Sequence, residues 1–557
     1  MLPGMMMHRP LNILQVLDYA AEIHPRREIV SVTLEGGLHR IGYRDVRGRV
    51  AKLANALVRL GLAPGDRVAT IAWNGYRHFE LYYATAGMGA VCHTINPRLA
   101  PEQLVYILRH AADRALFFDI TFAPLVDAIL PHLAPAPILV AMTDREHMPQ
   151  MQAADVRCYE DLVAAEPDSF DWLEVDENAA CALCYTSGTT GVPKAALYSH
   201  RSTMLHALAT PLSGQAAFQQ GNKILPVVPL FHVNAWGLPY SAPLAGVSLV
   251  MPGARLDGAS LFDLLEAEEV FSTWGVPTVW LGLLAEMNKR GRKPNGLVEV
   301  VIGGSAAPKS MIEAFESGFG VEVIHGWGMT EMSPIGTIGC LSPEHRRLPL
   351  AERIALKGKQ GRRLFGVDLK IVDDAGRLLP HDGRATGHLY VRGNTIVSGY
   401  YNNPEASRAA LDAEGWFATG DVAAIDPDGF LMITDRAKDL IKSGGEWISS
   451  IALENVAMAH PAIANCAVIA RPDLKWDERP LLIAVKAPGA ACAKEDILAF
   501  MADRIPRWQL PDDVVFVDAL PMTATGKVSK RLLRDRFAAT ASEGSAAGDP
   551  PPNAATP

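Results

Sequence analysis

Cysteine is scarce in this chain, which has only seven among 557 residues, and the seven are scattered. That number and spacing exclude a disulfide scaffold. Cys181 and Cys184 form a Cys-x-x-Cys pair, but no second Cys or His pair follows at zinc-binding spacing, so we expect two buried strand cysteines and no metal. Free cysteines are typical of a reducing compartment and favour a cytoplasmic protein.

The sequence also shows no strong charge excess and no internal repeat. A net charge of −9 is small for this length and argues against binding to nucleic acid. Residues 1–14 do not combine a basic region with a clean apolar core, so no secretory signal is expected. No fixed period recurs. The length exceeds that of one compact domain, so several domains are expected.

Residues 224–254 contain no Lys, Arg, Asp or Glu, and the run is long enough to cross a bilayer. Prolines recur through it and would repeatedly break a spanning helix: Pro226, Pro229, Pro239, Pro243 and Pro252. We therefore expect no transmembrane segment here. The run is interpreted as buried core or as the wall of a pocket for an apolar ligand.

Strand and helix patterns alternate through the first part of the chain. They follow one another at residues 66–73, 76–90, 91–95, 101–112 and 115–119, with strands at the first, third and fifth positions. Pro101 suits the first turn of a helix. The alternation recurs around 247–303 and predicts a parallel α/β sheet with right-handed crossovers.

The character changes after residue 360. Residues 360–435 show short strand patterns with Gly and Asp turns, which predict a β-rich subdomain at the end of an N-terminal domain that covers 1–435. A C-terminal domain is expected over 436–540, with helices near 450–459 and 494–504 and strands near 465–470 and 481–487. Residues 541–557 are rich in Ala, Gly, Pro and Ser and are expected to be disordered.

Residues 186–194, Thr-Ser-Gly-Thr-Thr-Gly-Val-Pro-Lys, are typical of a loop that holds phosphate. The loop offers glycines that free the backbone, hydroxyl donors and a cation: Gly188, Gly191, Ser187, Thr189, Thr190 and Lys194. A Walker loop needs four residues between its glycines and Ser or Thr after its lysine. Here two residues separate the glycines and Ala195 follows Lys194, so a Walker loop is excluded. Taken alone, the loop is also compatible with a structural turn.

This loop resembles the phosphate loop of the adenylate-forming superfamily, which includes acyl-CoA synthetases, adenylation domains of peptide synthetases and beetle luciferases. Four further segments match in order and approximate spacing: residues 325–334, 416–430, 435–447 and 521–534. The resemblance runs from about residue 12 to 536. It implies an α/β fold with a large N-terminal domain of α/β sheets plus a β-rich subdomain, and a small mobile α+β C-terminal domain. Most members have glycine at the position of Ala195.

The resemblance implies a two-step reaction. A carboxylate attacks the α-phosphorus of ATP and releases pyrophosphate, and a thiol then attacks the acyl carbon and expels AMP. Because an anion attacks a polyanion, neutralisation of charge and positioning are the main catalytic needs. The loop from Thr186 to Lys194 is implied to hold the β- and γ-phosphates, Thr330 to contact the α-phosphate, and Glu331 to hold Mg²⁺.

Further residues of adenylation follow from the matching segments. Trp327 is implied to lie against adenine, with a core aromatic as the alternative; the glycines beside it favour a face left open for a flat ligand. Asp421 is implied to accept hydrogen bonds from the ribose hydroxyls, and Arg436 to sit near the same ribose. Without the resemblance, Lys527 would be interpreted as a solvent-exposed lysine. The resemblance implies that it reaches the reacting carboxylate and the α-phosphate from the small domain.

For the second step the resemblance implies coenzyme A as the thiol and a rotation of the C-terminal domain about the hinge position, Lys438. Residues 442–447 would then line the pantetheine tunnel, where glycines leave room for close approach. The residues implied to contact the cofactor are Lys442, Gly444, Gly445, Glu446 and Trp447.

The acyl pocket is expected around residues 228–240. In fatty acyl-CoA synthetases the aromatic residue at the Trp236 position gates an acyl tunnel, and His232 lies by the carboxylate; a core histidine is the alternative. Small residues are expected along the pocket at Gly303, Gly304, Gly326 and Gly328. No dedicated cation is evident for a distal charge on the substrate, so an apolar acid is expected.

The whole pattern is most similar to medium- and long-chain fatty-acid CoA ligases, with methylthioalkanoate-CoA ligases nearby. It predicts an ATP-dependent ligase that joins a medium-chain fatty acid to CoA. The alternatives are a ligase for a methylthio- or aryl-alkanoate, a stand-alone enzyme that loads a carrier protein, a luciferase-type oxygenase, and a sensor without catalysis. Retention of the implied charged residues argues against the sensor. A homodimer is expected because fatty-acid relatives often form one.

Overall fold

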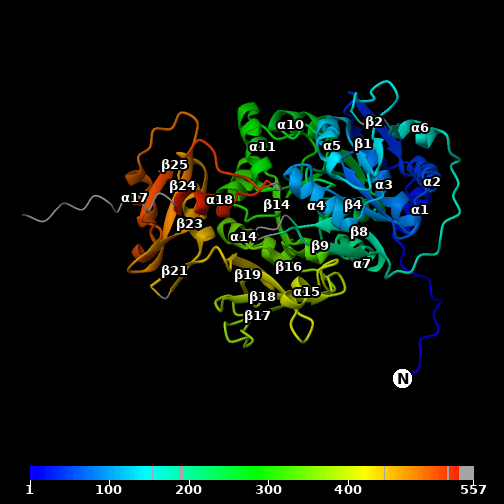
Figure 1. Ribbon diagram of the computed structural model, residues 1–557. Helices are drawn as coiled ribbons and strands as arrows, with labels where there is room; N and C mark the ends of the chain where they lie inside the picture. Colours follow the sequence, from blue (N-terminus) through cyan, green and yellow to red (C-terminus); the bar gives the residue numbers. More distant parts are fainter. Residues whose placement is uncertain (153–154, 187–191, 445, 524–525, 539–557) are drawn as a thin grey trace, which may run out of the picture. The chain divides into compact units, whose positions relative to one another are not determined.

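The computed structural model describes residues 1–557 except 153–154, 187–191, 445, 524–525 and 539–557 (Figure 1). The chain divides into two compact units. The large unit comprises Met1–Ala307, Met311–Thr419 and Ala424–Met432, and the small unit comprises Pro308–Ser310, Gly420–Ala423 and Ile433–Pro557. The division agrees with the expected mixed α/β class and with a large N-terminal and a smaller C-terminal part. The expected boundary between residues 435 and 436 stays a prediction.

The first sheet of the large unit has seven strands in the order β7-β6-β5-β3-β4-β8-β9. They are β7 (Val156–Cys158), β6 (Ile138–Ala141), β5 (Ala115–Phe118), β3 (Arg67–Ile71), β4 (Val91–Thr94), β8 (Ala180–Tyr185) and β9 (Ala195–Ser199). All neighbours are parallel except β8 and β9. The strands predicted at 66–73, 91–95 and 115–119 are thereby confirmed.

The order of this first sheet reverses at β3. Helix α3 (Tyr76–Gly87) leads from β3 to its neighbour β4, and α4 (Pro101–Ala111) leads back across to β5 on the other side of β3. Both helices confirm the periodicity of the sequence, and Pro101 stands in the first turn of α4 as expected. In parallel sheets such a reversal opens a crevice at the carboxyl ends of the strands.

The second sheet has thirteen strands in the order β17-β18-β19-β20-β16-β15-β14-β13-β12-β10-β11-β1-β2. They are β17 (Val367–Val372), β18 (Gly387–Gly393), β19 (Phe417–Ile425), β20 (Phe430–Arg436), β16 (Gly361–Arg363), β15 (Ile335–Ile338), β14 (Glu322–Gly328), β13 (Glu299–Ile302), β12 (Ser272–Gly275), β10 (Lys223–Pro226), β11 (Ser248–Met251), β1 (Glu28–Val32) and β2 (Leu38–Gly42). Strands from β14 to β1 pair in parallel. The antiparallel strands β16–β20 confirm the β-rich character of residues 360–435.

The uncharged run 224–254 is folded into the large unit. It forms β10, the short turn α8 (Val233–Trp236), α9 (Leu238–Leu244) and β11, and most of its apolar side chains are buried. Among the residues that the structure describes, no helix has the length and apolarity needed to cross a membrane. Proline interrupts the run as predicted, and the segment serves as core.

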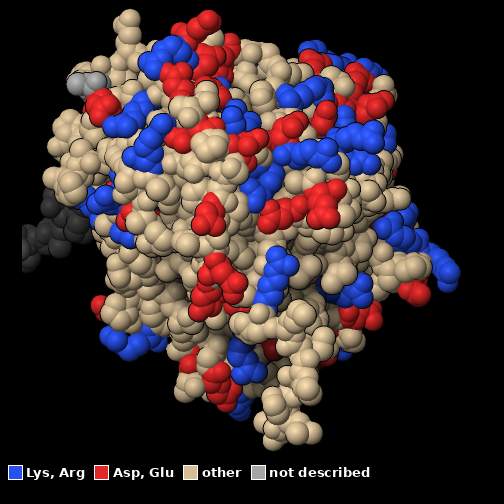
Figure 2. All heavy atoms as spheres, turned by 90° about the vertical axis from the view of Figure 1, so that its right-hand side faces the viewer, with Lys and Arg blue, Asp and Glu red and all other residues tan. Residues whose placement is uncertain are grey.

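Further helices of the large unit are α1 (Leu14–Ile23), α2 (Tyr43–Arg59), α5 (Ala123–Ile129), α6 (Tyr159–Ala164), α7 (His200–Ala209), α10 (Gly258–Ala267), α11 (Pro277–Arg290), α14 (Leu350–Lys357) and α15 (Pro404–Ala410). On the face drawn in Figure 2, basic and acidic side chains are interspersed and no large patch of one sign forms. That distribution fits the mild net charge and gives a nucleic acid no extended basic surface on this face.

The small unit has a sheet in the order β22-β21-β24-β23, with β25 paired to β24. Its elements are β21 (Ile441–Ser443), β22 (Glu446–Ile448), α16 (Ser450–Met458), β23 (Ile463–Asp473), β24 (Asp477–Lys486), α17 (Lys494–Ala502), β25 (Asp513–Phe516) and α18 (Lys530–Ala538). The expected helices and strands are present. Strands β23 and β24 form a hairpin longer than predicted, because its charged, exposed end lacks the apolar pattern of a buried strand.

Candidate active site

The ends of the predicted phosphate loop are held by antiparallel strands β8 and β9. The amide of Thr186 donates to the carbonyl of Lys194 at 2.7 Å, which closes the loop at its base. Ser187, Gly188, Thr189, Thr190 and Gly191 lie outside the described residues. Ala195 is the first residue of β9, is fully buried and pairs with Tyr185, so the chain carries its methyl group in an extended strand.

Thr330 and Glu331 lie in one short turn between β14 and β15, and both are buried. The hydroxyl of Tyr198 donates to the carbonyl of Thr330. The hydroxyl of Tyr400 donates to Oε1 of Glu331 at 2.8 Å, and Nζ of Lys194 lies 5.0 Å from the centre of the Tyr400 ring. The structure therefore gathers the base of the phosphate loop and the turn of Glu331 around one tyrosine.

A Mg²⁺ ion would find one carboxylate, Glu331, at this place. Among the described residues no three His, Cys, Asp or Glu side chains form a metal cluster. Magnesium is commonly held by one or two carboxylates together with substrate phosphates and water. One buried and oriented carboxylate next to a phosphate loop fits that donor set.

Trp327 is half-buried in β14, and the glycines beside it have a packing role. A Cβ on Gly328 would lie 2.2 Å from the carbonyl oxygen of Pro334, and one on Gly326 would lie 3.2 Å from that of Thr337. The close approach of β15 thus accounts for these glycines without a ligand. The contact of Trp327 with adenine stays a prediction.

The predicted acyl residues Trp236 and Gly303 lie against each other. A Cβ on Gly303 would be 2.8 Å from the Trp236 indole and 3.2 Å from the carbonyl oxygen of Gly326. The structure therefore brings Trp236, Gly303 and Gly326 together, whereas Gly304 is exposed at a positive φ. His232 is half-buried directly before the turn that carries Trp236.

The turn from Val233 to Trp236 is left-handed. Its four φ values lie between 43° and 57°, and Gly237 continues at 81°. Non-glycine residues cost roughly 1–2 kcal/mol each in this conformation, so the surroundings must impose it. One such contact is His206, whose ring would lie 2.7 Å from a Cβ on Gly237 and whose Nε2 accepts a hydrogen bond from the amide of Ile335.

In the small unit Asp421 and Arg436 form an ion pair of 2.9 Å. Lys527 interacts electrostatically with both, and burial together with the Arg436 guanidinium lowers the pKa of Lys527 to about 8. The amide of Lys527 donates to the Thr523 hydroxyl, within a tight turn. The predicted ribose ligands and the predicted catalytic lysine are therefore neighbours.

Helix α18 anchors this part of the small unit, a role that sequence reasoning missed. Arg534 pairs with Asp439 at 2.7 Å, next to the exposed Lys438. Lys530 pairs with Glu454 at 2.7 Å. The segment that begins at Lys438 and helix α16 are thus tied to α18, which follows Lys527 along the chain.

The predicted pantetheine residues lie around the β21–β22 hairpin. Lys442, Glu446 and Trp447 are exposed, and Gly445 lies outside the described residues. Gly444 has a φ of 62°, and its amide donates to the carbonyl of Trp476 at 2.8 Å. A Cβ on Gly444 would lie 2.8 Å from the Trp476 ring, so glycine is required here by both conformation and space.

The Cys-x-x-Cys pair of the sequence lies in strand β8. Cys181 and Cys184 are both buried, and burial raises the pKa of their thiols, to about 12 for Cys181 and about 11 for Cys184. Such thiols stay protonated at neutral pH and behave as small apolar side chains.

Comparison with known proteins matches almost the whole chain. The family model "AMP-binding enzyme" covers residues 17–401, and "AMP-binding enzyme C-terminal domain" covers 452–527. A "3-methylmercaptopropionyl-CoA ligase" of Ruegeria lacuscaerulensis is 50% identical over 96% of this chain and 98% of its own. A "Medium-chain-fatty-acid--CoA ligase" of Ectopseudomonas oleovorans is 49% identical over 96% and 97%. A "Long-chain-fatty-acid--CoA ligase" of Thermus thermophilus is 44% identical with the same coverage.

A solved structure extends this likeness to the fold. The crystal structure of an anthranilate CoA ligase in complex with anthranoyl-AMP superposes with a TM-score of 0.85 at 25% identity, covering 96% of this chain and 99% of its own. The family models, the relatives and the fold agree with one another. The chain therefore belongs to the AMP-binding enzyme family and is an acid–CoA ligase of the AMP-forming type.

Proposed function

We propose that this ligase activates a medium-chain fatty acid, with a methylthio- or aryl-alkanoate as the alternative acid. The observation that carries the proposal is the contact of Trp236 with Gly303 in a segment that has no charged residue between 224 and 254. Apolar walls of this kind suit an aliphatic chain and offer nothing to a distal charge. The names of the relatives support both the fatty and the methylthio acid.

In the first step the chain's own residues would position and neutralise the reacting anions. Lys194 and the loop at 186–194 hold the β- and γ-phosphates, Thr330 the α-phosphate, and His232 lies by the substrate carboxylate. Lys527 supplies a positive charge to that carboxylate and the α-phosphate. Glu331 would hold Mg²⁺, which offsets the charge of the phosphates.

The nucleoside half of ATP would be held by three residues. Trp327 stacks on adenine, and Asp421 accepts hydrogen bonds from the ribose hydroxyls. Arg436, paired with Asp421 at 2.9 Å, fixes the orientation of that carboxylate and stays near the ribose. A carboxylate is well suited to accept hydrogen bonds from two hydroxyl donors.

For the second step we propose that the C-terminal domain rotates about Lys438 and presents residues 442–447 to CoA. The exposed side chains of Lys442, Glu446 and Trp447 support this role, because a ligand can reach them. Two crystal forms with one interdomain angle, one holding ATP and acid and the other holding AMP and CoA, would contradict the rotation.

We further propose that the protein forms a homodimer and is located in the cytoplasm. A homodimer follows from the family resemblance and is checked by light scattering. A cytoplasmic location is supported by the free thiols: all seven cysteines are unpaired.

The test of function is a panel of acids, from acetate to palmitate with aryl and methylthio acids, assayed with ATP and free CoA. We expect AMP release to depend on CoA and to be fastest with acids of medium length. Release with a carrier protein and none with CoA would establish the carrier-loading alternative. If AMP release is fastest with a methylthio or aryl acid, that class of acid is the substrate and the fatty-acid proposal is wrong.

A further inference from the structure

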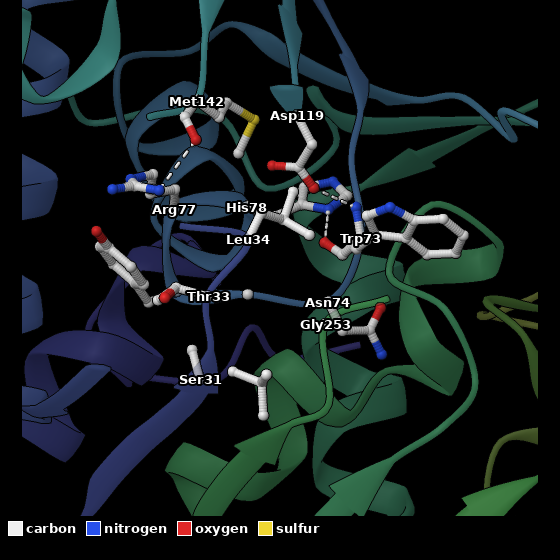
Figure 3. Close-up of a pocket in the computed structure, with 13 residues that line it drawn as sticks. Ser31, Thr33, Leu34, Trp73, Asn74, Arg77, His78, Asp119, Met142 and Gly253 are labelled. Atoms are coloured by element: carbon white, nitrogen blue, oxygen red, sulfur yellow. Dashed lines mark hydrogen bonds between the residues drawn. The ribbon is translucent and has the colours of Figure 1, made fainter. Parts of the chain in front are cut away.

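A small cavity lies at the point where the order of the first sheet reverses. The residues of its lining that matter here are Ser31, Trp73, Tyr76, Arg77, Asp119 and Met142 (Figure 3). Trp73 follows β3, Asp119 follows β5 and Met142 follows β6, so the carboxyl ends of three neighbouring parallel strands meet there. This is the position at which open α/β sheets bind ligands.

The size of the cavity restricts what it can hold. Its volume is about 30 Å³. That is room for a pair of waters or one tetrahedral ion, and too little for an acyl chain or a nucleotide.

The cavity offers donors suited to an anion. The first turn of α3, from Tyr76, forms part of its wall, and none of the described side chains caps that helix end. Free amides and the helix dipole there favour negative charge. Arg77 adds a guanidinium, which also pairs with Glu35 and Glu160, each at 2.7 Å, and donates to the carbonyl of Met142 at 3.0 Å.

Ser31 points independently to a missing partner. Its side chain lines the cavity at only 1% exposure, and in the described part of the chain nothing bonds to its Oγ. A buried hydroxyl without a partner is unfavourable, so an occupant that accepts its hydrogen bond is favoured.

Asp119 sets the chemistry of that occupant. Its side chain is 9% exposed, and its Oδ2 accepts a 2.7 Å hydrogen bond from the amide of Trp73. Figure 3 shows the other oxygen, Oδ1, turned toward the side of the cavity that Arg77 and Met142 line. A carboxylate beside an anion site repels a fully deprotonated ion, whereas it accepts a hydrogen bond from an ion that carries a proton.

We propose that this cavity binds a protonated tetrahedral oxyanion, hydrogen phosphate, which the amides of α3 and Ser31 hold through its oxygens and Asp119 through its proton. Sulfate has the same shape but no proton at neutral pH, so it is the discriminating competitor. Burial raises the pKa of Asp119 to about 7, while the hydrogen bond from the Trp73 amide and the Arg77 charge oppose that shift and Glu35 adds to it. Ion and carboxylate therefore share one proton at neutral pH.

The site adjoins the segment that leads to the acyl residues. Between Trp73 and the first turn of α3 stands Asn74, whose Nδ2 donates to the carbonyls of Pro226 and Val228 at 2.8 and 2.9 Å. Its Oδ1 accepts a 2.6 Å hydrogen bond from the amide of Leu230. An ion at this turn would rest on the same loop that fixes the start of residues 228–240.

The experiment is calorimetric titration of the full chain with inorganic phosphate and with sulfate, at pH 7.5 and constant ionic strength. A Lys194→Ala background removes the cation of the phosphate loop, which would otherwise contribute its own anion binding. We expect one saturable phosphate site in that background, with affinity about tenfold above that for sulfate. No saturable heat with phosphate, or equal affinity for both ions, would overturn the proposal.

Two variants in the same background test the residues. Asp119→Asn replaces an acceptor by a group that also donates, so the preference for phosphate over sulfate should fall to within about threefold. Ser31→Ala removes only a hydroxyl and should weaken both ions by several-fold without changing their ratio. An unchanged preference in a folded Asp119→Asn variant would contradict the role of Asp119. If Asp119→Asn does not fold, the proposal is still tested by the phosphate-to-sulfate affinity ratio of the Lys194→Ala protein and by the Ser31→Ala titration.

Discussion

The hydroxyl of Tyr400 donates a 2.8 Å hydrogen bond to Oε1 of Glu331, although the two residues are 69 positions apart in the chain. Burial and the nearby carboxylate raise the pKa of Tyr400, so its hydroxyl stays protonated and can only donate in this pair. Tyr400 is therefore a positioning residue for the proposed Mg²⁺ ligand.

Tyr400→Phe removes the hydrogen bond of about 1 kcal/mol that orients the Glu331 carboxylate. The Mg²⁺ concentration for half-maximal ATP–pyrophosphate exchange should therefore rise by about fivefold. The rate at saturating Mg²⁺ should change less. Tyr401→Phe is the matched control, since the Tyr401 ring packs against His110 and its hydroxyl has no hydrogen-bond partner among the described residues. An equal loss of rate at all Mg²⁺ concentrations would mean that Tyr400 acts on the fold and not on the metal ligand.

Lys527→Ala should lose ATP–pyrophosphate exchange by about a hundredfold or more, which corresponds to about 3 kcal/mol of transition-state stabilisation. The same variant should still convert preformed acyl-adenylate and CoA to acyl-CoA, because that step needs no charge at the α-phosphate of ATP. Both half-reactions are measured on one preparation. Equal losses in the two would remove Lys527 from the adenylation step.

The lowered pKa of Lys527, about 8, predicts the pH dependence of adenylation. Lysine is charged below its pKa, so the catalytic charge is present at pH 7 and is lost as the pH rises through 8. Well above pH 8, kcat/KM for exchange should fall by about tenfold per unit. Lys527→Arg keeps its charge at high pH and should flatten this limb, at whatever rate its geometry allows. A profile that is the same in both proteins would assign the limb to another group.

Local pattern predicted much of the fold. Buried parallel strands such as β3 and β5 are short apolar runs between turn residues, so their positions follow from the sequence to within a few residues. The end of the β23–β24 hairpin was not predicted, because its exposed charged residues do not show the apolar pattern of a buried strand. Partners distant in sequence, such as Tyr400 and Glu331, are created by the sheet topology and have no local signature.

The left-handed turn from Val233 to Trp236 was likewise beyond prediction. In a sequence, left-handed backbone is normally indicated by glycine or asparagine. Val233 is β-branched, and its type favours extended structure. Only Gly237, at the end of the turn, gives a hint. The tertiary contacts around the turn therefore override local preference, as expected at a functional segment.

Gly303→Ala should disturb the acyl site specifically. The new methyl group would lie 2.8 Å from the Trp236 indole, so the ring must move. We expect kcat/KM for medium-chain acids to fall by about tenfold while KM for ATP stays within about twofold. Ser305→Ala, at an exposed position nearby, is the control. A similar rise in KM for ATP would place Gly303 outside the acyl pocket.

Gly237→Ala tests the packing that holds the left-handed turn. Alanine at a φ of 81° costs roughly 1–2 kcal/mol by itself, and its Cβ would meet the His206 ring at 2.7 Å. Gly214→Ala is the matched control, because its φ is 90° and nothing lies within 4 Å of an added Cβ. We expect the control to lower the thermal midpoint of the large unit slightly, and Gly237→Ala to lower it at least twice as far, because overpacking adds about 1–3 kcal/mol. Equal shifts in the two variants would show that the His206 ring yields freely and that another contact imposes the turn.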